Sequence, residues 1–441
     1  MRMPGWCAAL VVLVSLGATP ARAFDVVISE QGEFADLYVP NGTAFPPKYV
    51  FIDPDPVVPI CPADPTNPNC TRPPRVGKHV NGKLCFFPPG FGHNHKFVTA
   101  EDGYRESCMD WTNGPNPRTN PSGQLQPQSR CYDDRGRWFF GHDPDGWAIF
   151  KANGRWAKRH IATEWPAFSA QPIGQGAPTP QPQGNIDPQG CVFDAHGNMW
   201  GNDVGSGDPT NMDASQRGSL LVFFPGPRKR YDSYCFLDKN LSQAGMPAMD
   251  DAGNIYVAET GMGMMWKYSP PFPTSAADCA NADHLVTTPP TKTQFPVSAT
   301  APTPGSIVRV PGTDHWYIGS VLLPGVPGQG GGIINEYDAN GLFVRNIVPS
   351  TELKNPLGMD VGSDGTLYYS ELNLNTDTST GCGRVSQVRF VNGTPQAPEV
   401  LGQNLSFPDG VTVVDSSQLR IPITRLPPAP EPDPATCNGG G

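Results

Sequence analysis

Four polar residues of this chain stand at matching positions, each at the end of a short apolar run that follows a turn. They are His142, Asp203, Glu259 and Glu371, and Asp409 stands just before another apolar run. If the fold gathers these side chains at one mouth, the cluster attracts a cation or shifts pKa values far enough for acid–base chemistry. The spacing therefore identifies a candidate site.

The residue types suggest two roles within that site. We predict catalytic roles for His142, Asp203 and Glu371, and metal binding by Glu259 and Asp409. Two carboxylates 4 Å apart repel each other by roughly 4 kcal/mol at an effective dielectric constant near 20. A divalent cation such as Ca²⁺ would relieve that repulsion. The alternative is structural, with each acid only accepting hydrogen bonds from the turn beside it.

The elements that must position these residues form a repeat. Six segments consist of an apolar strand, a tight turn that mostly contains Asp and Gly, and a second apolar strand. The second strands align at Phe139, Trp200, Tyr256, Tyr317, Tyr368 and Arg420, about 56 residues apart on average. A third strand follows most of these pairs. Four-stranded units repeated around an axis predict an all-β, six-bladed β-propeller with four-stranded blades.

The last blade needs strands from both ends of the chain. Lys83–Pro88 is similar to Leu220–Pro225, which is one of the third strands. We therefore expect residues 83–99 to pair with residues 408–424. Such a closure between N-terminal and C-terminal strands leaves no open sheet edge.

Composition divides the rest of the chain. An apolar run that ends in Ala21-Arg22-Ala23 predicts a signal peptide, and hence a secreted or periplasmic protein. The segments that flank the propeller are rich in Pro and have no periodicity, so we expect loops there. The predicted divisions are a signal peptide at 1–23, an N-terminal extension at 24–82, the propeller at 83–424 and a C-terminal tail at 425–441.

Charge and cysteine content limit the partners. The net charge is −10 and no basic run exceeds Arg228-Lys229-Arg230, so we expect no nucleic-acid partner. Beyond the leader no stretch approaches 18 apolar residues, so we expect no membrane span. The 11 cysteines include Cys7 of the leader, and an even number in an oxidising compartment predicts up to five disulfides.

Three motifs resemble a known superfamily. They are Asp194-x-x-Gly-Asn-Met-Trp, Asp250-x-x-Gly-Asn-Ile-Tyr-Val-Ala-Glu and Phe407-Pro-Asp-Gly. They look like the strands of the gluconolactonase/senescence-marker group, of NHL-type and strictosidine-synthase-like propellers, of paraoxonases and of streptogramin lyases. The resemblance covers about residues 83–424. In the gluconolactonase-like group a divalent cation sits on the axis, and Pro408-Asp409-Gly410 matches one of its ligand motifs.

Three functions remain open at this level. The first is an exported hydrolase of a lactone or ester, in which an axial Ca²⁺ polarises the carbonyl and a carboxylate or His142 activates water. The second is a non-enzymatic propeller that binds a small molecule or a protein. The third, implied by the resemblance, is a metal-assisted lyase of the streptogramin type. The oligomeric state is not predicted.

Overall fold

The computed structural model describes residues 24–30, 77–80, 83–86, 93–97, 105–106, 126–133, 135–143, 146–150, 156–160, 188–205, 217–227, 231, 233–280, 284–321, 331–349, 353, 355–372, 383–405, 408–415 and 424–425. Within these ranges the protein is all-β, and its helices are two 3-10 turns, η5 (Thr260–Met262) and η6 (Ala276–Asp278). None of the helices described here is long and apolar enough to cross a membrane. The predicted signal peptide lies outside the described ranges and stays a prediction.

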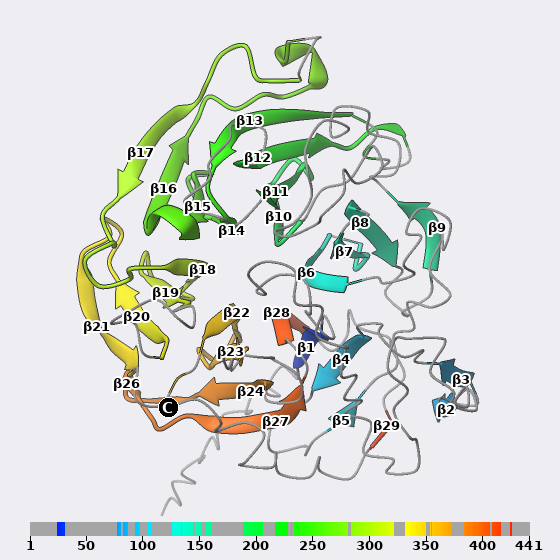
Figure 1. Cartoon of the computed structure of the whole chain (residues 1–441), viewed down its shortest axis with the longest axis vertical. Coiled ribbons are helices and arrows are strands. Elements are labelled where there is room, and N and C mark those ends of the chain that lie inside the picture. Colours follow the sequence, from blue (N-terminus) through cyan, green and yellow to red (C-terminus); the bar gives the residue numbers. More distant parts are fainter. Residues whose placement is uncertain are drawn as a thin grey trace, which may run out of the picture.

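Antiparallel four-stranded sheets surround a common centre, as Figure 1 shows. The first contains β6 (Gln126–Tyr132), β7 (Trp138–Asp143), β8 (Gly146–Phe150) and β9 (Trp156–His160). The second contains β10 (Cys191–Phe193), β11 (Met199–Gly205), β12 (Arg217–Phe224) and β13 (Ser233–Leu241). The third contains β14 (Ala244–Met249), β15 (Ile255–Glu259), β16 (Met264–Ser269) and β17 (Thr291–Phe295).

Two more sheets follow the same order of strands. The fourth contains β18 (Pro304–Arg309), β19 (Trp316–Ser320), β20 (Ile333–Tyr337) and β21 (Phe343–Val348). The fifth contains β22 (Pro356–Val361), β23 (Leu367–Glu371), β24 (Gly383–Val388) and β27 (Glu399–Leu405). A three-stranded sheet contains β28 (Pro408–Asp415), β1 (Phe24–Glu30) and β4 (His93–Phe97).

Three small pairs complete the described strands. They are β2 (Gly77–Val80) with β3 (Lys83–Phe86), β25 (Phe390–Val391) with β26 (Thr394–Pro395), and β5 (Arg105–Glu106) with β29 (Thr424–Arg425). The first strands of the larger sheets contact one another in the order β6, β10, β14, β18, β22 and β28, and β28 also contacts β6. This radial arrangement is a β-propeller, as the repeat predicts.

The strand that pairs with β28 is not the predicted one. Lys83–Phe86 pairs with β2, whereas β28 pairs with Phe24–Glu30. The predicted pairing of residues 83–99 with residues 408–424 is therefore wrong for the strand Lys83–Phe86. The expected loop at residues 24–82 is likewise wrong at β1 and at β2. The physical reason is burial, because Val26 and Ile28 alternate along β1 and pack against Val411 of β28. Lys83–Pro88 is similar in sequence to the third strand Leu220–Pro225, but its strand β3 pairs with β2 and does not occupy a third-strand position.

The predicted Asp/Gly turns are confirmed between the first two strands of a sheet. Asp194 Oδ1 accepts a hydrogen bond from the backbone N–H of Asn198 at 2.9 Å, and Oδ2 accepts one from the Trp200 indole at 3.0 Å. Gly197 has φ of 79°, a conformation that favours glycine. The turn at Asp250 is built in the same way. These acids therefore have a structural role.

Two disulfides are present among the described residues. Cys131–Cys191 joins β6 to β10, with 5.5 Å between the Cα atoms. Cys235–Cys279 joins β13 to the segment after η6, with 5.9 Å between the Cα atoms. The prediction of paired cysteines is confirmed for these residues. The pairing of the other mature cysteines lies outside the described side chains.

Candidate functional site

The predicted site residues occupy repeated positions in the sheets. Asp203 lies in β11, Glu259 ends β15, Glu371 ends β23, and Asp409 is the second residue of β28. All four are buried, with exposed fractions of 3, 6, 0 and 0 %. His142 lies in β7, and its side chain is outside the described set.

The carboxylate of Glu371 is held by an arginine on the next strand of its own sheet. Arg384 of β24 donates from Nε to Oε1 at 2.7 Å and from Nη2 to Oε2 at 2.8 Å. Burial opposes the charged form of Arg384, but the hydrogen bond and charge of Glu371 outweigh it and raise the pKa of the guanidinium. A cation placed here would be repelled by Arg384, so the position does not fit a calcium ligand.

Glu259 is engaged by two neutral donors. Its Oε1 accepts from the backbone N–H of Ser242 at 2.8 Å, and its Oε2 accepts from the Trp266 indole at 2.5 Å. Ser320 stands at the same position in the next sheet, and its hydroxyl accepts from the backbone N–H of Thr303 at 2.9 Å. Both residues thus hold the segment that leads into the first strand of their sheet. The role of Glu259 is therefore structural, but its donors lie before β14 and on β16 rather than in the turn beside it, as the structural alternative expected.

A link between neighbouring sheets, missed by sequence reasoning, lies one residue before two of these acids. Asn202 accepts from the Gly190 N–H at 2.8 Å and donates to the carbonyl of Ala244 in the next sheet at 2.6 Å. Ser370 likewise donates to the carbonyl of Asp409 at 2.6 Å. In the sequence, this link could have been predicted from the short polar residue directly before each acid, in Asn202-Asp203 and in Ser370-Glu371.

Strand geometry separates the acids from these links. Successive side chains of a strand point to opposite faces of its sheet, so Glu371 faces away from the sheet that Ser370 contacts. The close contact itself depends on Gly358, because a Cβ there would overlap the Asp409 carbonyl oxygen. Glycine at this position lets adjacent first strands meet backbone to backbone, and Gly245 does the same against the carbonyl oxygen of Gly305.

The described side chains do not form the predicted metal cluster. Within them, no three His, Cys, Asp or Glu residues lie close enough together to hold a metal ion. Asp203 and Asp409 are each engaged in a polar or electrostatic interaction. Their roles, and that of His142, stay predictions.

A second polar cluster lies on the fourth sheet, where β20 and β21 meet the turn before β19. Glu336, 5 % exposed, contacts His315 Nδ1 at 2.7 Å and accepts from Arg345 Nε at 2.6 Å. Burial and the charge of Glu336 raise the pKa of Tyr317 to about 12. Val310 stands where the other turns carry Asp194 and Asp250, and Glu336 of β20 supplies the carboxylate here instead. The cluster therefore has a structural explanation.

These contacts define a β-propeller whose described acids mostly hold the fold together. No family model and no curated protein matches this chain. The superfamily resemblance therefore depends on the repeat motifs, and the function must be argued from the surface and the buried contacts.

Proposed function

We propose that this chain is a non-enzymatic binding propeller that engages a partner protein through its rim. The observation that carries the proposal is a group of exposed apolar side chains, here called the rim patch. It contains Leu342, Phe343, Val344 and Val391, with exposed fractions of 61, 50, 43 and 55 %. Contiguous exposed apolar residues on a soluble domain mark interaction sites.

The two parts of the rim patch are joined by an arginine. Arg345 of β21 donates to the carbonyl of Gly393, in the turn of the β25–β26 hairpin, and its guanidinium lies 5.8 Å from the centre of the Phe390 ring. The Phe390 ring also stacks on Tyr317 at 5.7 Å. In Figure 1, β21 and β26 lie side by side at the left rim. The hairpin is therefore fixed against the edge of the fourth sheet.

The buried acids also favour binding over catalysis. Glu371 is neutralised by Arg384, and both oxygens of Glu259 accept hydrogen bonds within the fold. A catalytic carboxylate needs a lone pair directed at substrate or water. Glu259 is 6 % and Glu371 0 % exposed, so neither presents its carboxylate to solvent in this arrangement.

The test is partner capture by cross-linking in the compartment where the protein is made. The wild-type chain should yield one discrete cross-linked partner, and Leu342→Asp should lose it. Val400→Asp is the matched control, because Val400 is 44 % exposed on β27, outside the rim patch. Equal capture by the wild type and both variants would refute the role of the patch.

A calcium-dependent hydrolase of a lactone or ester is the second proposal. Its support is the burial of Asp203 and Asp409, because buried carboxylates are common at functional sites. Metal analysis of the purified chain decides between the two, followed by lactone, ester and lyase assays with and without chelator. Chelator-sensitive turnover that Asp409→Asn abolishes would overturn the binding proposal.

We also propose that the ring has six blades and belongs to the gluconolactonase-like and NHL-like superfamily. The sixth blade would be the sheet of β28, β1 and β4, which is supported by the contacts of β28 with both β22 and β6. Val27 lies opposite Thr412, so Val27→Cys/Thr412→Cys should form a disulfide. If this disulfide does not form, the proposal of a sixth blade made of β28, β1 and β4 is wrong.

Export remains part of the same proposal. The protein recovered outside the cytoplasm should begin near Phe24, directly after the Ala21-Arg22-Ala23 site. N-terminal sequencing measures this start. A mature protein that retains Met1 would contradict the signal peptide.

A further inference from the structure

The turn of the β25–β26 hairpin consists of Asn392 and Gly393. Val391 and Thr394 pair across it, and the two turn residues have φ of 50° and 76°. Positive φ at both positions is typical of a two-residue hairpin turn. Both residues are exposed, and a Cβ built on Gly393 would have no atom within 4 Å. The Asn-Gly peptide bond therefore lies open to water beside Val391 of the rim patch.

An asparagine followed by glycine carries its own modification chemistry, and asparagine is among the thermolabile residues. The Gly393 nitrogen loses its proton to hydroxide and attacks Cγ of Asn392. A C–N bond forms, ammonia leaves with a proton from water, and a cyclic succinimide remains. Water then breaks one of the two ring C–N bonds, which gives aspartate or, when the main-chain bond breaks, isoaspartate. In sum, one water is consumed and one ammonia is released, without oxidation or reduction.

A second Asn-Gly pair in the described part of the chain provides an internal comparison. Asn340 is exposed and precedes Gly341 in the turn between β20 and β21. The Gly341 N–H donates to the Asp338 carbonyl at 3.0 Å, and a Cβ on the buried Gly341 would lie 2.7 Å from Cδ of Pro296. Among the described residues, no group accepts a hydrogen bond from the Gly393 N–H. The nucleophilic nitrogen is therefore bonded and covered in one pair and accessible in the other.

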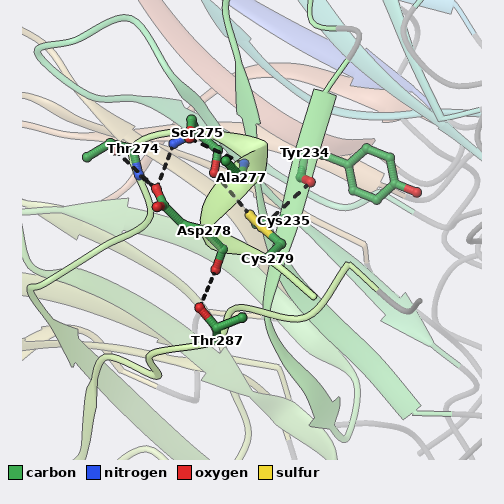
Figure 2. The surroundings of a disulfide bond; sticks show 8 residues. All are labelled: Tyr234, Cys235, Thr274, Ser275, Ala277, Asp278, Cys279 and Thr287. Carbon is green, nitrogen blue, oxygen red and sulfur yellow. Dashed lines mark hydrogen bonds between the residues drawn. A yellow bond between two sulfur atoms is a disulfide. The ribbon is translucent and has the colours of Figure 1, made fainter. Parts of the chain in front are cut away.

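The hairpin is also held by few contacts of its own. It has two opposed residue pairs, so a small local opening lets Asn392 turn its side chain toward the next nitrogen. Figure 2 shows a more firmly held loop, in which Cys279 is bonded to Cys235. There Asp278 Oδ2 also accepts from the Thr274 N–H at 2.7 Å. Neither kind of anchor holds the β25–β26 turn among the described contacts, so this turn opens more readily.

We propose that Asn392 is a site of spontaneous deamidation, and that its conversion to isoaspartate releases the hairpin from Arg345. Isoaspartate adds a methylene to the main chain, which a two-residue turn of fixed φ does not accommodate. The Gly393 carbonyl, which accepts a hydrogen bond from Arg345, is then displaced. The modification thereby switches off partner binding at the rim patch as the protein ages. This last step rests on the proposed function, whereas the deamidation itself does not.

The experiment ages the full chain in mildly alkaline buffer, folded and, in parallel, unfolded in urea. Peptide mass mapping with electron-transfer fragmentation measures aspartate and isoaspartate at Asn392 and at Asn340. In urea the two sites should react at similar rates. In the folded chain Asn392 should react on the order of fivefold faster, because Gly341 has one more hydrogen bond to break. Equal rates in the folded chain, or a faster Asn340, would overturn the site.

Asn392→Gly is the matched variant, because glycine accepts the positive φ and lacks the side-chain amide. The release of the hairpin is measured by deuterium exchange at the Gln396 amide, which donates to the Arg389 carbonyl at 2.8 Å. Exchange should become on the order of tenfold faster in the aged wild type and stay unchanged in the aged variant. Modified wild type with unchanged exchange would overturn the release from Arg345.

Partner capture by the aged wild type tests the last step separately. Capture should fall in proportion to the modified fraction, and the aged Asn392→Gly variant should keep it. Mass mapping needs no partner, so its result stands whether or not the rim patch binds one. Modification at Asn392 with unchanged capture would overturn the switch at the rim patch and leave the modification site in place.

Discussion

Glu259 and Glu371 stand at the same position of two sheets, and their carboxylates are held by different kinds of donor. Glu371 forms a two-point ion pair with Arg384 of β24, whereas Glu259 takes neutral N–H groups from Ser242 and Trp266. In both sheets one donor comes from the third strand. These two sheets therefore share a buried acid bonded to the third strand, while the nature of the donor varies.

The largest expected effect is the loss of the charged donor. Arg384→Met leaves Glu371 buried without its charged partner, and removing one partner of a buried ion pair costs about 3–5 kcal/mol. Because Arg384 is itself 37 % exposed, we expect the lower end, about 3 kcal/mol. Urea unfolding monitored by fluorescence measures the change. The double variant Glu371→Gln/Arg384→Met should recover much of it, and a single-variant loss below about 1 kcal/mol would show that the pair is not stabilising.

Loss of the neutral donor should matter less. Trp266→Phe keeps the ring but removes the indole N–H from Glu259, which retains the Ser242 donor. We expect a loss of about 1–2 kcal/mol in the free energy of unfolding. Tyr256→Phe is the control, because it removes only the hydroxyl that bonds Asp250, which keeps its Asn254 donors. If the two variants lose the same stability, the indole of Trp266 has no special role.

Loss of a link between sheets should have an intermediate to small effect. Ser370→Ala removes the hydroxyl that joins Gly358 to the carbonyl of Asp409, and we expect a loss of about 1 kcal/mol. Thermal unfolding measures it. Ser386→Ala is a control within the same sheet, because its hydroxyl makes only a longer 3.2 Å bond to Glu371 among the described contacts. A larger effect for Ser386→Ala would contradict the importance of the link.

The smallest effect depends on pH and tests the outer edge of the third sheet. Burial favours protonated Asp238, but Lys292, at 2.6 Å, and the Tyr268 hydroxyl lower its pKa below the ordinary value. A lowered pKa in the folded state gives stability that is present above about pH 4 and is lost as the pH falls further. Lys292→Met should therefore flatten the acid side of the stability curve. An unchanged curve from pH 2 to 6 would rule this out.

Local chemistry made part of this fold predictable. The turn at Asp194 needs an acid, a glycine with positive φ and nearby donors, and all of them lie within seven residues of sequence. The strand that pairs with β28 was not predictable in this way, because Phe24–Glu30 lies next to the predicted cleavage site, in a segment with no repeat motif; Val26 and Ile28 are its described buried residues. Its partner is at the far end of the chain, so no local pattern identifies the pair.

The candidate site shows the same limit. The equivalence of Glu259 and Glu371 follows from the repeat, but whether each carboxylate faces a ligand or its own sheet depends on the donor opposite. Arg384 and Trp266 lie on third strands whose register the sequence pattern does not determine. A charge in a repeat position therefore predicts burial and pairing better than it predicts catalysis.

The pairing of β1 with β28 has a consequence for how the chain is made. During synthesis Phe24 emerges first, and its partner Asp415 emerges only after almost every other strand. Until then β1 has no edge to join through β28, and the first and fifth sheets lack the neighbour that β28 provides between them. Premature termination anywhere before β28 should therefore leave an open, aggregation-prone arc. Only a chain synthesised through β28 can therefore close the ring of sheets.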